Sequence, residues 1–318
     1  MNDLAPEERA WNLLRGALGT RALALVSELG VADALEGGPR PVSEIAGELG
    51  AEPETLHRLL RALASDGVFV EQELGVFGNT VASELLRRGG GWREFAHLFG
   101  GVWYRAVGDL DATGEPPFPR MFGTDLWSWL AAHPDERAAF DCAMKQGKER
   151  RVERLSPVNW RGDETVVDVG GGNGSLLVEL LRLHPGLRGI VFDRPETVRD
   201  EAALGDRIRF VAGDFFKRAP EGDVYVLSTI LHDWDDEHAV AILRTVRAAA
   251  SAGARLLILD TVMPPGNEPN GAKWLDLLML TLSGGKERTQ AQWRELLDAG
   301  GFEPVRFHEA LIEAAPAN

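Results

Sequence analysis

The sequence predicts an α/β protein with a doubly wound parallel sheet, preceded by a smaller helical unit. From about residue 163 onward, short apolar runs alternate with helical stretches, which is typical of parallel strands joined by helices. Before that point, residues 1–90 show helical spacing and end in a hairpin-like tail. At 318 residues the chain is also long enough for two domains of roughly 150 residues each.

Composition excludes several other classes of protein. With 44% hydrophobic and 26% charged residues, the chain lies near the average of soluble globular proteins. No apolar run approaches the roughly 20 residues of a membrane span, and the acidic N-terminus lacks an apolar signal region. We therefore expect a cytoplasmic protein with no membrane partner. The single cysteine, Cys142, rules out an internal disulfide and a cysteine-rich zinc site.

The charge of the first 90 residues argues against a nucleic-acid partner. Their helices and hairpin-like tail are arranged as in a winged helix-turn-helix, with Ser43 as the expected N-cap of one helix and Gly50 as its end. DNA binding is the obvious alternative, but this unit has 8 Arg against 14 acidic residues, and the whole chain has a net charge of −15. We expect the apolar stretches 22–26 and 31–35 to pack against a second copy, as a homodimer.

Aromatic side chains gather in residues 91–155, which we expect to be helical. At this density they are core residues more often than binding residues. The Gly- and Pro-containing segment 114–119 is nevertheless suited to cover a pocket.

Five short apolar runs predict the strands of the sheet. They span residues 165–169, 189–193, 208–212, 223–227 and 255–260, with helices at 175–183 and 236–250. In a doubly wound sheet the ligand crevice lies at the carboxyl ends of the strands. Residues at these ends are therefore candidates for a site.

The first strand ends in the glycine-rich turn DVGGGNG, residues 168–174. Gly170 and Gly172 allow the backbone to approach a ligand closely, and the helix that follows offers free N–H groups to a carboxylate or phosphate. A dinucleotide pattern requires Gly or Ala where Ser175 stands, and Asp168 precedes the first glycine. The turn indicates a nucleotide-type ligand without choosing among them.

Two further acids follow the next strands. Asp193 is placed to accept both hydroxyls of a ribose, and Asp214 to accept an adenine amino group while Phe215 covers the ring. Three acids at successive strand ends suit adenosine with a cationic tail, as in S-adenosylmethionine. The alternative is that Asp193 and Asp214 only cap the turns that follow their strands.

The fourth strand leads into the run LHDWDDEH, residues 231–238. His232 is expected at the carboxyl edge of the sheet, ahead of a helix that Asp235 can cap. Six helical residues turn through about 600°, so His232 and His238 face different directions, unlike the histidine pair of a zinc helix. We expect no metal site.

Together these motifs are similar to those of the S-adenosylmethionine-dependent small-molecule O-methyltransferases, typified by plant caffeate and flavonoid enzymes and bacterial polyketide-tailoring enzymes. The shared motifs, in order, are DVGGGNG, VFD, GDFF, LHDWxDE and GGKERT. The resemblance covers nearly the whole chain. It implies a Rossmann-like cofactor domain over residues 91–318, with an acceptor-binding helical segment at 91–155, behind an all-helical winged-helix dimerisation domain over residues 1–90.

The resemblance also implies roles for single residues. His232 would be the general base, flanked by Asp260 and Glu287. The cofactor set would be Asp168, Gly170, Gly172, Asp193, Asp214, Phe215 and Ser228. The acceptor pocket would be lined by Trp103, Phe140, Met144, Met279 and Ser283. Asp260 stands where the plant enzymes have glutamate, and Ser228 where they have lysine, so these contacts differ from the family pattern.

The resulting prediction is methyl transfer from S-adenosylmethionine to a phenolic or enolic hydroxyl of an aromatic secondary metabolite. A phenol with a pKa near 10 needs a base, and a histidine oriented by a carboxylate supplies one near neutral pH. The alternatives are an N-methyltransferase, a relative that binds the cofactor without transferring methyl, an NAD-dependent oxidoreductase and a ligand-sensing regulator. The sequence leaves open whether Asp260 or Glu287 orients His232.

Overall fold

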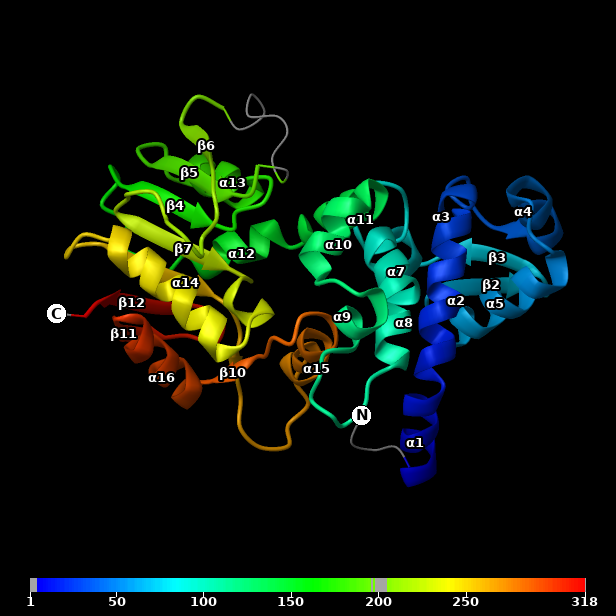
Figure 1. Ribbon diagram of the computed structural model, residues 1–318. Helices are drawn as coiled ribbons and strands as arrows, with labels where there is room; N and C mark the ends of the chain where they lie inside the picture. Colours follow the sequence, from blue (N-terminus) through cyan, green and yellow to red (C-terminus); the bar gives the residue numbers. More distant parts are fainter. Residues whose placement is uncertain (1–4, 196, 198–204, 318) are drawn as a thin grey trace. The chain divides into compact units, whose positions relative to one another are not determined.

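The computed structural model describes residues 5–195, 197 and 205–317, which form two compact units (Figure 1). One unit combines the residues up to Gly108 with residues 132–146, and the other combines residues 109–131 with the chain from Gly147 onward. This grouping differs from the predicted division at residue 90, because α7 (Trp92–Gly100) packs along α2 (Gly16–Leu29), and α11 (Pro134–Met144) packs on α7. The domain boundary at residue 90 stays a prediction.

The first unit is mainly helical. Besides α2, α7 and α11, its helices are α1 (Pro6–Leu14), α3 (Val31–Ala34), α4 (Val42–Leu49), α5 (Pro53–Ser65), α6 (Val81–Glu84) and α8 (Val102–Gly108). The expected hairpin-like tail is the antiparallel pair β2 (Phe69–Glu73) and β3 (Val76–Asn79). A short strand β1 (Arg40–Pro41) pairs with β3, so the unit contains a three-stranded sheet and is not all-helical.

Local chemistry explains where the helices of this unit begin and end. Gly50, with φ of +68°, ends α4 in the left-handed conformation, as predicted. The expected N-cap Ser43 lies instead inside the first turn of α4, because Pro41 precedes the helix and takes the cap position. The Glu52 carboxylate caps α5 by accepting the backbone N–H groups of Glu54 and Thr55 at 3.0 and 2.7 Å.

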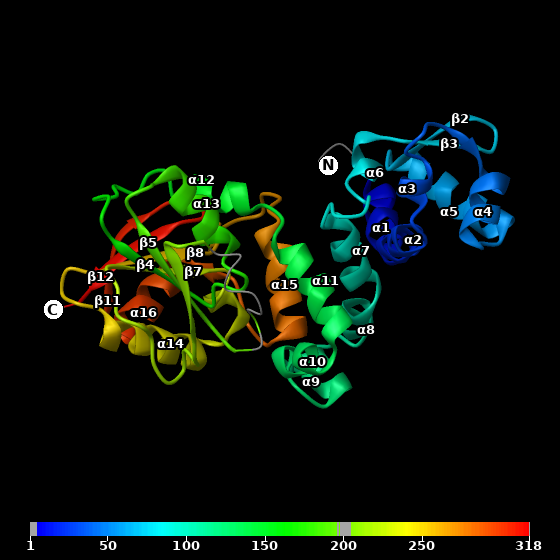
Figure 2. The same cartoon turned by 90° about the horizontal axis from the view of Figure 1, so that it is seen from above.

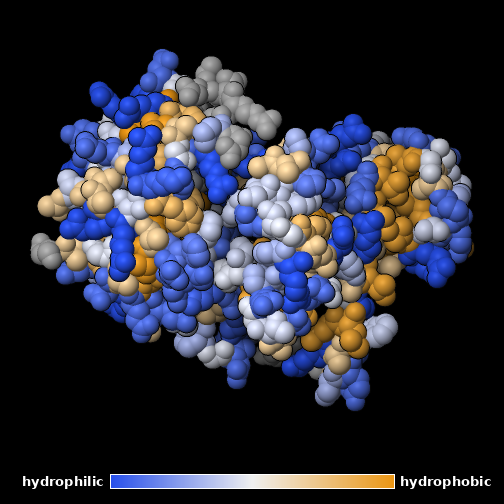
Figure 3. All heavy atoms as spheres, viewed as in Figure 1, coloured by the Kyte–Doolittle hydropathy of each residue, from blue (hydrophilic) through white to orange (hydrophobic). Residues whose placement is uncertain are grey.

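The apolar stretches 22–26 and 31–35 contribute to the core of this unit. Val26, Val31 and Leu35 are at most 2% exposed and pack with α5, so the expectation that these stretches face a second copy is wrong. The exposed apolar residues lie earlier in the chain: Trp11, Leu13, Leu14 and Leu18 are 61–74% exposed. Figure 3 shows hydrophobic surface near α1 and the start of α2.

The second unit is built on a seven-stranded sheet with the strand order β11-β12-β8-β7-β4-β5-β6. Its parallel strands are β4 (Thr165–Val169), β5 (Arg188–Asp193), β6 (Ile208–Ala212), β7 (Val224–Ser228) and β8 (Arg255–Leu259). All five predicted strands are confirmed to within one residue at each end. The antiparallel strands β11 (Phe302–Phe307) and β12 (Ile312–Pro316) were not predicted.

The remaining elements connect or cover these strands. They are α9 (Pro117–Phe122), α10 (Leu126–Ala132), α12 (Lys148–Arg154), α13 (Ser175–Leu183), the short 3-10 helix η2 (Leu231–Asp233), α14 (Asp236–Ala249), β9 (Val262–Met263), α15 (Ala272–Leu282), β10 (Arg288–Thr289) and α16 (Gln290–Gly300). The predicted helices 175–183 and 236–250 correspond to α13 and α14. Asp235 caps α14 as predicted, accepting the His238 N–H at 2.9 Å.

Helices cover both faces of the sheet, with α12 and α13 on one face and α14 and α16 on the other (Figure 2). Successive residues of β4 point to opposite faces: Val166 packs with α13, and Val167 packs with α14. Because both faces are buried, the strands are continuous apolar runs in the sequence. β4 lies between β5 and β7, and the chain order reverses there, which places a crevice at the carboxyl ends of these strands.

The exposed apolar residues of α1 and α2 predict where a second copy binds. We expect Leu14→Glu combined with Leu18→Glu to raise the dimer dissociation constant at least about tenfold, or about 1.4 kcal/mol, because two charges enter an apolar interface. Sedimentation velocity over a dilution series measures the dissociation constant. Leu74→Glu is the control, since Leu74 is 91% exposed in the β2–β3 hairpin and lies outside α1 and α2. An unchanged dissociation constant in the double variant would contradict the prediction.

Candidate functional site

The order of the sheet brings the predicted cofactor residues to one edge. Strands β6, β5, β4, β7 and β8 lie side by side in parallel, so their carboxyl ends share that edge. Asp214, Asp193, Gly170, Ser228 and Asp260 each stand at one of these ends or shortly after it. Residues from the ends of five separate strands are thereby collected in one part of the unit.

The turn after β4 requires glycine for two reasons. Gly170 and Gly172 have φ of +71° and +59°, in the left-handed region that side chains disfavour. A Cβ atom on Gly170 would lie 2.5 Å from the Ile230 side chain. The Gly172 N–H donates to Asp193 Oδ2 at 2.8 Å, so the turn is tied to the end of β5.

Asp193 holds the backbone that follows β5. Its Oδ1 accepts the Arg194 N–H at 2.6 Å and the Thr197 hydroxyl at 3.0 Å, in addition to the bond from Gly172 to Oδ2. The carboxylate therefore caps the turn, as the alternative interpretation expected. A carboxylate has about four acceptor sites, so these three bonds leave one for a ligand hydroxyl. Ribose binding by Asp193 stays a prediction.

Asp168 is a buried acid with an unsatisfied oxygen. The residue is 2% exposed, and its Oδ2 has no hydrogen-bond partner in the described part of the chain. The pKa of Asp168 is raised to about 7, chiefly by burial and also by the charge of Asp193, while Arg151 opposes the rise. A carboxyl of this kind beside a glycine turn fits a cationic ligand group, such as the ammonium of S-adenosylmethionine.

The acid that follows β6 is followed in turn by aromatic residues that pack on one another. Asp214 Oδ1 accepts the Phe216 N–H at 3.0 Å, and Lys217 lies 3.1 Å from Oδ2. Burial raises the pKa of Asp214, but these hydrogen bonds and charges lower it below its usual value, so the group is ionised. The Phe215 ring lies 6.1 Å from the Trp234 ring. Trp234 is absent from the predicted set, although the LHDW motif contained it.

His232 and Glu287 form a buried pair between distant segments. His232 Nδ1 lies 2.7 Å from Glu287 Oε1, across 55 residues of sequence, and the two residues are 8% and 5% exposed. In a neutral imidazole this contact places the proton on Nδ1 and leaves the lone pair on Nε2. The contact also answers the question left open by the sequence, because Glu287 and not Asp260 holds Nδ1.

Two further carboxylates surround this imidazole. Asp233 Oδ1 lies 3.7 Å from His232 Nε2. Asp260 is 1% exposed, and the Leu231 backbone N–H lies near enough to its carboxylate to lower its pKa. The pKa of Asp233 is raised to about 7 and that of Asp260 to about 6. Burial is the largest cause, the neighbouring carboxylates add to it, and the charge of His232 opposes both shifts. Asp233 was missed in the sequence, where its place next to His232 was the available signal.

The charges around His232 give the base a higher pKa than the sequence analysis expected. Burial lowers the pKa of His232, but Asp233, Asp260 and the contact with Glu287 outweigh burial and raise it to about 10. This direction favours the protonated imidazole and differs from the expectation of a base that is neutral near pH 7. The sequence did not reveal that three carboxylates converge on one imidazole, and the protonation state of the base stays a prediction.

The predicted acceptor residues lie in different compact units. Trp103 and Phe140 belong to the first unit, where their rings pack edge to face with centroids 6.4 Å apart, and Met144 follows on α11. Met279 and Ser283 belong to the second unit, in and just after α15. A pocket that combines all five stays a prediction.

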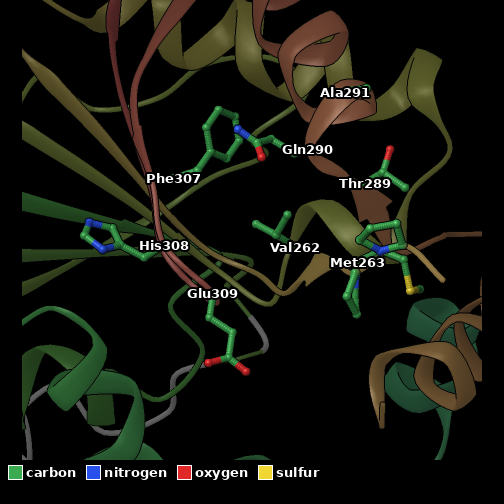
Figure 4. A pocket seen from close by; sticks show the side chains of 10 residues that line it. Val262, Met263, Thr289, Gln290, Ala291, Phe307, His308 and Glu309 are labelled. Atoms are coloured by element: carbon green, nitrogen blue, oxygen red, sulfur yellow. The ribbon is translucent and has the colours of Figure 1, made fainter. Parts of the chain in front are cut away.

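The described part of the second unit also contains a groove outside the predicted site. A groove beside β9 and β10 contains none of the predicted site residues; it is lined by Val262, Met263, Pro264, Pro265, Thr289, Gln290, Ala291, Phe307, His308 and Glu309 (Figure 4). Within the same described ranges, His, Cys, Asp and Glu side chains form no group of three or more suited to a metal ion, and no helix is long and apolar enough to cross a membrane.

Several known proteins are similar to this chain in both sequence and fold. The phenazine O-methyltransferase PhzM of Lysobacter antibioticus is 40% identical, over 96% of this chain and 94% of that protein. The crystal structure of LaPhzM matches with a TM-score of 0.91 at 37% identity, covering 98% of this chain and all of the other. NcsB1 from neocarzinostatin biosynthesis, in complex with S-adenosylmethionine and 2-hydroxy-5-methyl naphthoic acid, matches with a TM-score of 0.80 at 34% identity over 93% and 95% of the two chains.

Protein families match both parts of the chain. Residues 11–89 match the O-methyltransferase dimerisation domain, which supports the predicted homodimer. Residues 104–303 match the O-methyltransferase domain. The residues at the strand ends fit adenosine with a cationic tail. The family domain covers more than half of the chain, and the relatives match it nearly from end to end. The chain therefore belongs to the S-adenosylmethionine-dependent O-methyltransferases.

Proposed function

We propose that the chain methylates a phenolic or enolic hydroxyl of an aromatic secondary metabolite, with His232 as the general base. The buried contact between His232 Nδ1 and Glu287 Oε1, 2.7 Å long at the carboxyl edge of the sheet, is the observation that carries this proposal. The acceptor class is supported by the relatives, whose names include a phenazine O-methyltransferase and an enzyme solved with a naphthoic acid. The cytoplasmic location stays a prediction.

The strand-end residues would hold the cofactor. Asp168 and the turn at Gly170 and Gly172 would bind its amino-acid end, Asp193 its ribose, and Asp214 its adenine. Phe215 would cover the adenine ring, and Ser228 would add a hydroxyl at the end of β7. S-adenosylmethionine, when bound, supplies a methyl group already activated on a sulfonium, so no metal or redox group is needed for the transfer. The part left to the protein is to align the acceptor oxygen, exclude water and remove a proton.

The acceptor hydroxyl would lose its proton to Nε2 of His232. In the neutral imidazole Nδ1 donates to Glu287, so Nε2 carries the lone pair that accepts the hydroxyl proton. The imidazolium that forms is stabilised by Glu287, Asp233 and Asp260. Because these carboxylates raise the pKa of His232, its neutral imidazole is a stronger base than free histidine and is suited to accept the proton of a phenol.

Replacing the base tests the proposal directly. We expect His232→Ala to lower the single-turnover methylation rate by about 10²–10⁴-fold, the usual contribution of a positioned base. The affinity for S-adenosylmethionine should remain near that of the wild type, because His232 is proposed to act on the acceptor. Hydroxynaphthoates and hydroxyphenazines are the acceptors, with product detected by mass spectrometry. His308→Ala, in the same unit but outside the site, is the control. A wild-type rate in His232→Ala would overturn the proposed role.

The raised pKa of His232 predicts an alkaline rate profile. The base must be neutral, and the neutral fraction grows as pH rises, so the wild-type rate should increase about tenfold per unit above pH 7 and level off toward pH 10. Glu287→Gln removes a charge that raises this pKa. Its profile should therefore level off at lower pH and at a lower rate. Single-turnover rates between pH 6 and 10 measure both effects, and superimposable profiles would contradict the assignment.

The cofactor assignment predicts a loss of binding at Asp193. Asp193→Ala should weaken S-adenosylhomocysteine binding by on the order of 2–3 kcal/mol, because hydrogen bonds to a charged acceptor are lost. Isothermal titration calorimetry measures the dissociation constant. Asp163→Ala is the control, since Asp163 is exposed before β4, at the opposite end of the strand. Equal affinities in the two variants would refute ribose binding by Asp193.

A further inference from the structure

The turn that carries His232 is held by a neighbouring segment of the chain. Arg288 is fully buried, and its guanidinium donates to the carbonyl oxygens of Leu231 and Trp234, at 2.8 Å each. It also donates to Asp236 Oδ1 at 2.9 Å. Since Leu231 and Trp234 stand on either side of His232 and Asp233, Arg288 fixes both ends of the turn between them.

The same segment packs directly against the backbone of His232. The Lys286 N–H donates to the His232 carbonyl oxygen at 2.9 Å. At Gly285 a Cβ atom would lie 2.0 Å from that oxygen, so only glycine permits this approach. The position of residues 285–288 therefore decides the position of the imidazole.

Glu287 is held from a third element, the helix α15. Asp276 Oδ1 accepts the Glu287 backbone N–H at 2.8 Å, while the Glu287 side chain contacts His232 Nδ1 at 2.7 Å. A carboxylate makes a stronger acceptor for this N–H than a neutral group would. Asp276 lies about one turn before Met279 on α15, the helix predicted to line the acceptor pocket.

We propose that Asp276 is a positioning residue for methyl transfer, which sets the backbone of Glu287 and through it the orientation of His232. This inference rests on the proposed function of His232 as the base. Without the acceptor on Asp276, the Glu287 N–H loses its partner, and residue 287 moves to find another. The contact between Glu287 and His232 then lengthens, the pKa of His232 falls, and Nε2 leaves the line of proton transfer.

Three substitutions of Asp276 distinguish its role in positioning Glu287 from the effects of its charge and of its packing. Asp276→Asn keeps an oxygen acceptor in the same place and removes the charge. Asp276→Leu keeps the branched shape of the side chain and removes the acceptor. Asp276→Glu keeps the charge and displaces the acceptor by one methylene. Lys273→Leu is the matched control on α15, because Lys273 also donates side-chain hydrogen bonds to a neighbouring loop, at the carbonyls of Gly266 and Glu268, without contacting the segment 285–288.

The full-length variants are compared with a hydroxynaphthoate that the wild type methylates. We expect Asp276→Leu to lower the single-turnover rate about tenfold or more, since misplacement by about 1 Å can cost up to about 100-fold. Its pH profile should level off at lower pH, and S-adenosylmethionine affinity should stay within about twofold of wild type. Asp276→Glu should shift the rate and profile in the same direction. Asp276→Asn and Lys273→Leu should match the wild type.

The outcomes distinguish this inference from the proposed function. Wild-type rates and pH profiles in both Asp276→Leu and Asp276→Glu, with the expected loss in His232→Ala, overturn the positioning role and leave the base intact. If Asp276→Leu does not fold, Asp276→Glu alone decides. An Asp276→Asn variant as slow as Asp276→Leu also overturns the inference, because the charge and not the hydrogen bond would then matter. Full activity in His232→Ala would contradict the proposed function itself, in which His232 is the general base.

Discussion

The contact between His232 Nδ1 and Glu287 Oε1 is the interaction on which the proposed chemistry depends. Both side chains are almost fully buried, and a buried charge is costly unless it is paired and hydrogen-bonded. The contact joins the turn after β7 to the segment before β10. The buried guanidinium of Arg288 and the N–H group of Lys286 join these two backbones, and Asp276 on α15 accepts the N–H of Glu287. The imidazole is thereby oriented before any acceptor binds.

The second constraint is an excess of negative charge around this imidazole. Asp233, Asp260 and Glu287 lie near one histidine, and Arg288 is the nearby buried cation that favours the ionised form of Asp260. The cluster therefore favours the protonated form of His232 and makes the neutral imidazole a stronger base than free histidine. A base of this strength suits an acceptor that must lose its proton as the methyl is transferred.

The cofactor edge combines structural and ligand-binding functions in the same acids. Asp193 ties the glycine turn to the end of β5 and caps the turn that follows, so its orientation is set before a ligand arrives. Asp168 differs, because one of its oxygens is buried without a partner among the described residues. A cationic group that pairs with this oxygen would relieve the cost of its burial. The protein thus supplies some of the hydrogen bonds of these acids, and a bound ligand would supply the others.

The sequence by itself determined the parallel strands, the helices α13 and α14, the glycine turn and the cap at Asp235. These features depend on local patterns, since strands buried on both faces are continuous apolar runs, and glycine is needed where φ is positive. Only the tertiary structure decided that Glu287 and not Asp260 holds His232, that three carboxylates raise its pKa, and that Asp276 reaches the Glu287 backbone. It also decided that residues 22–26 and 31–35 are core and that β11 and β12 complete the sheet. The physical reason is the same in each case: these contacts join segments far apart in the chain, and burial and electrostatics depend on distances that no local spacing encodes.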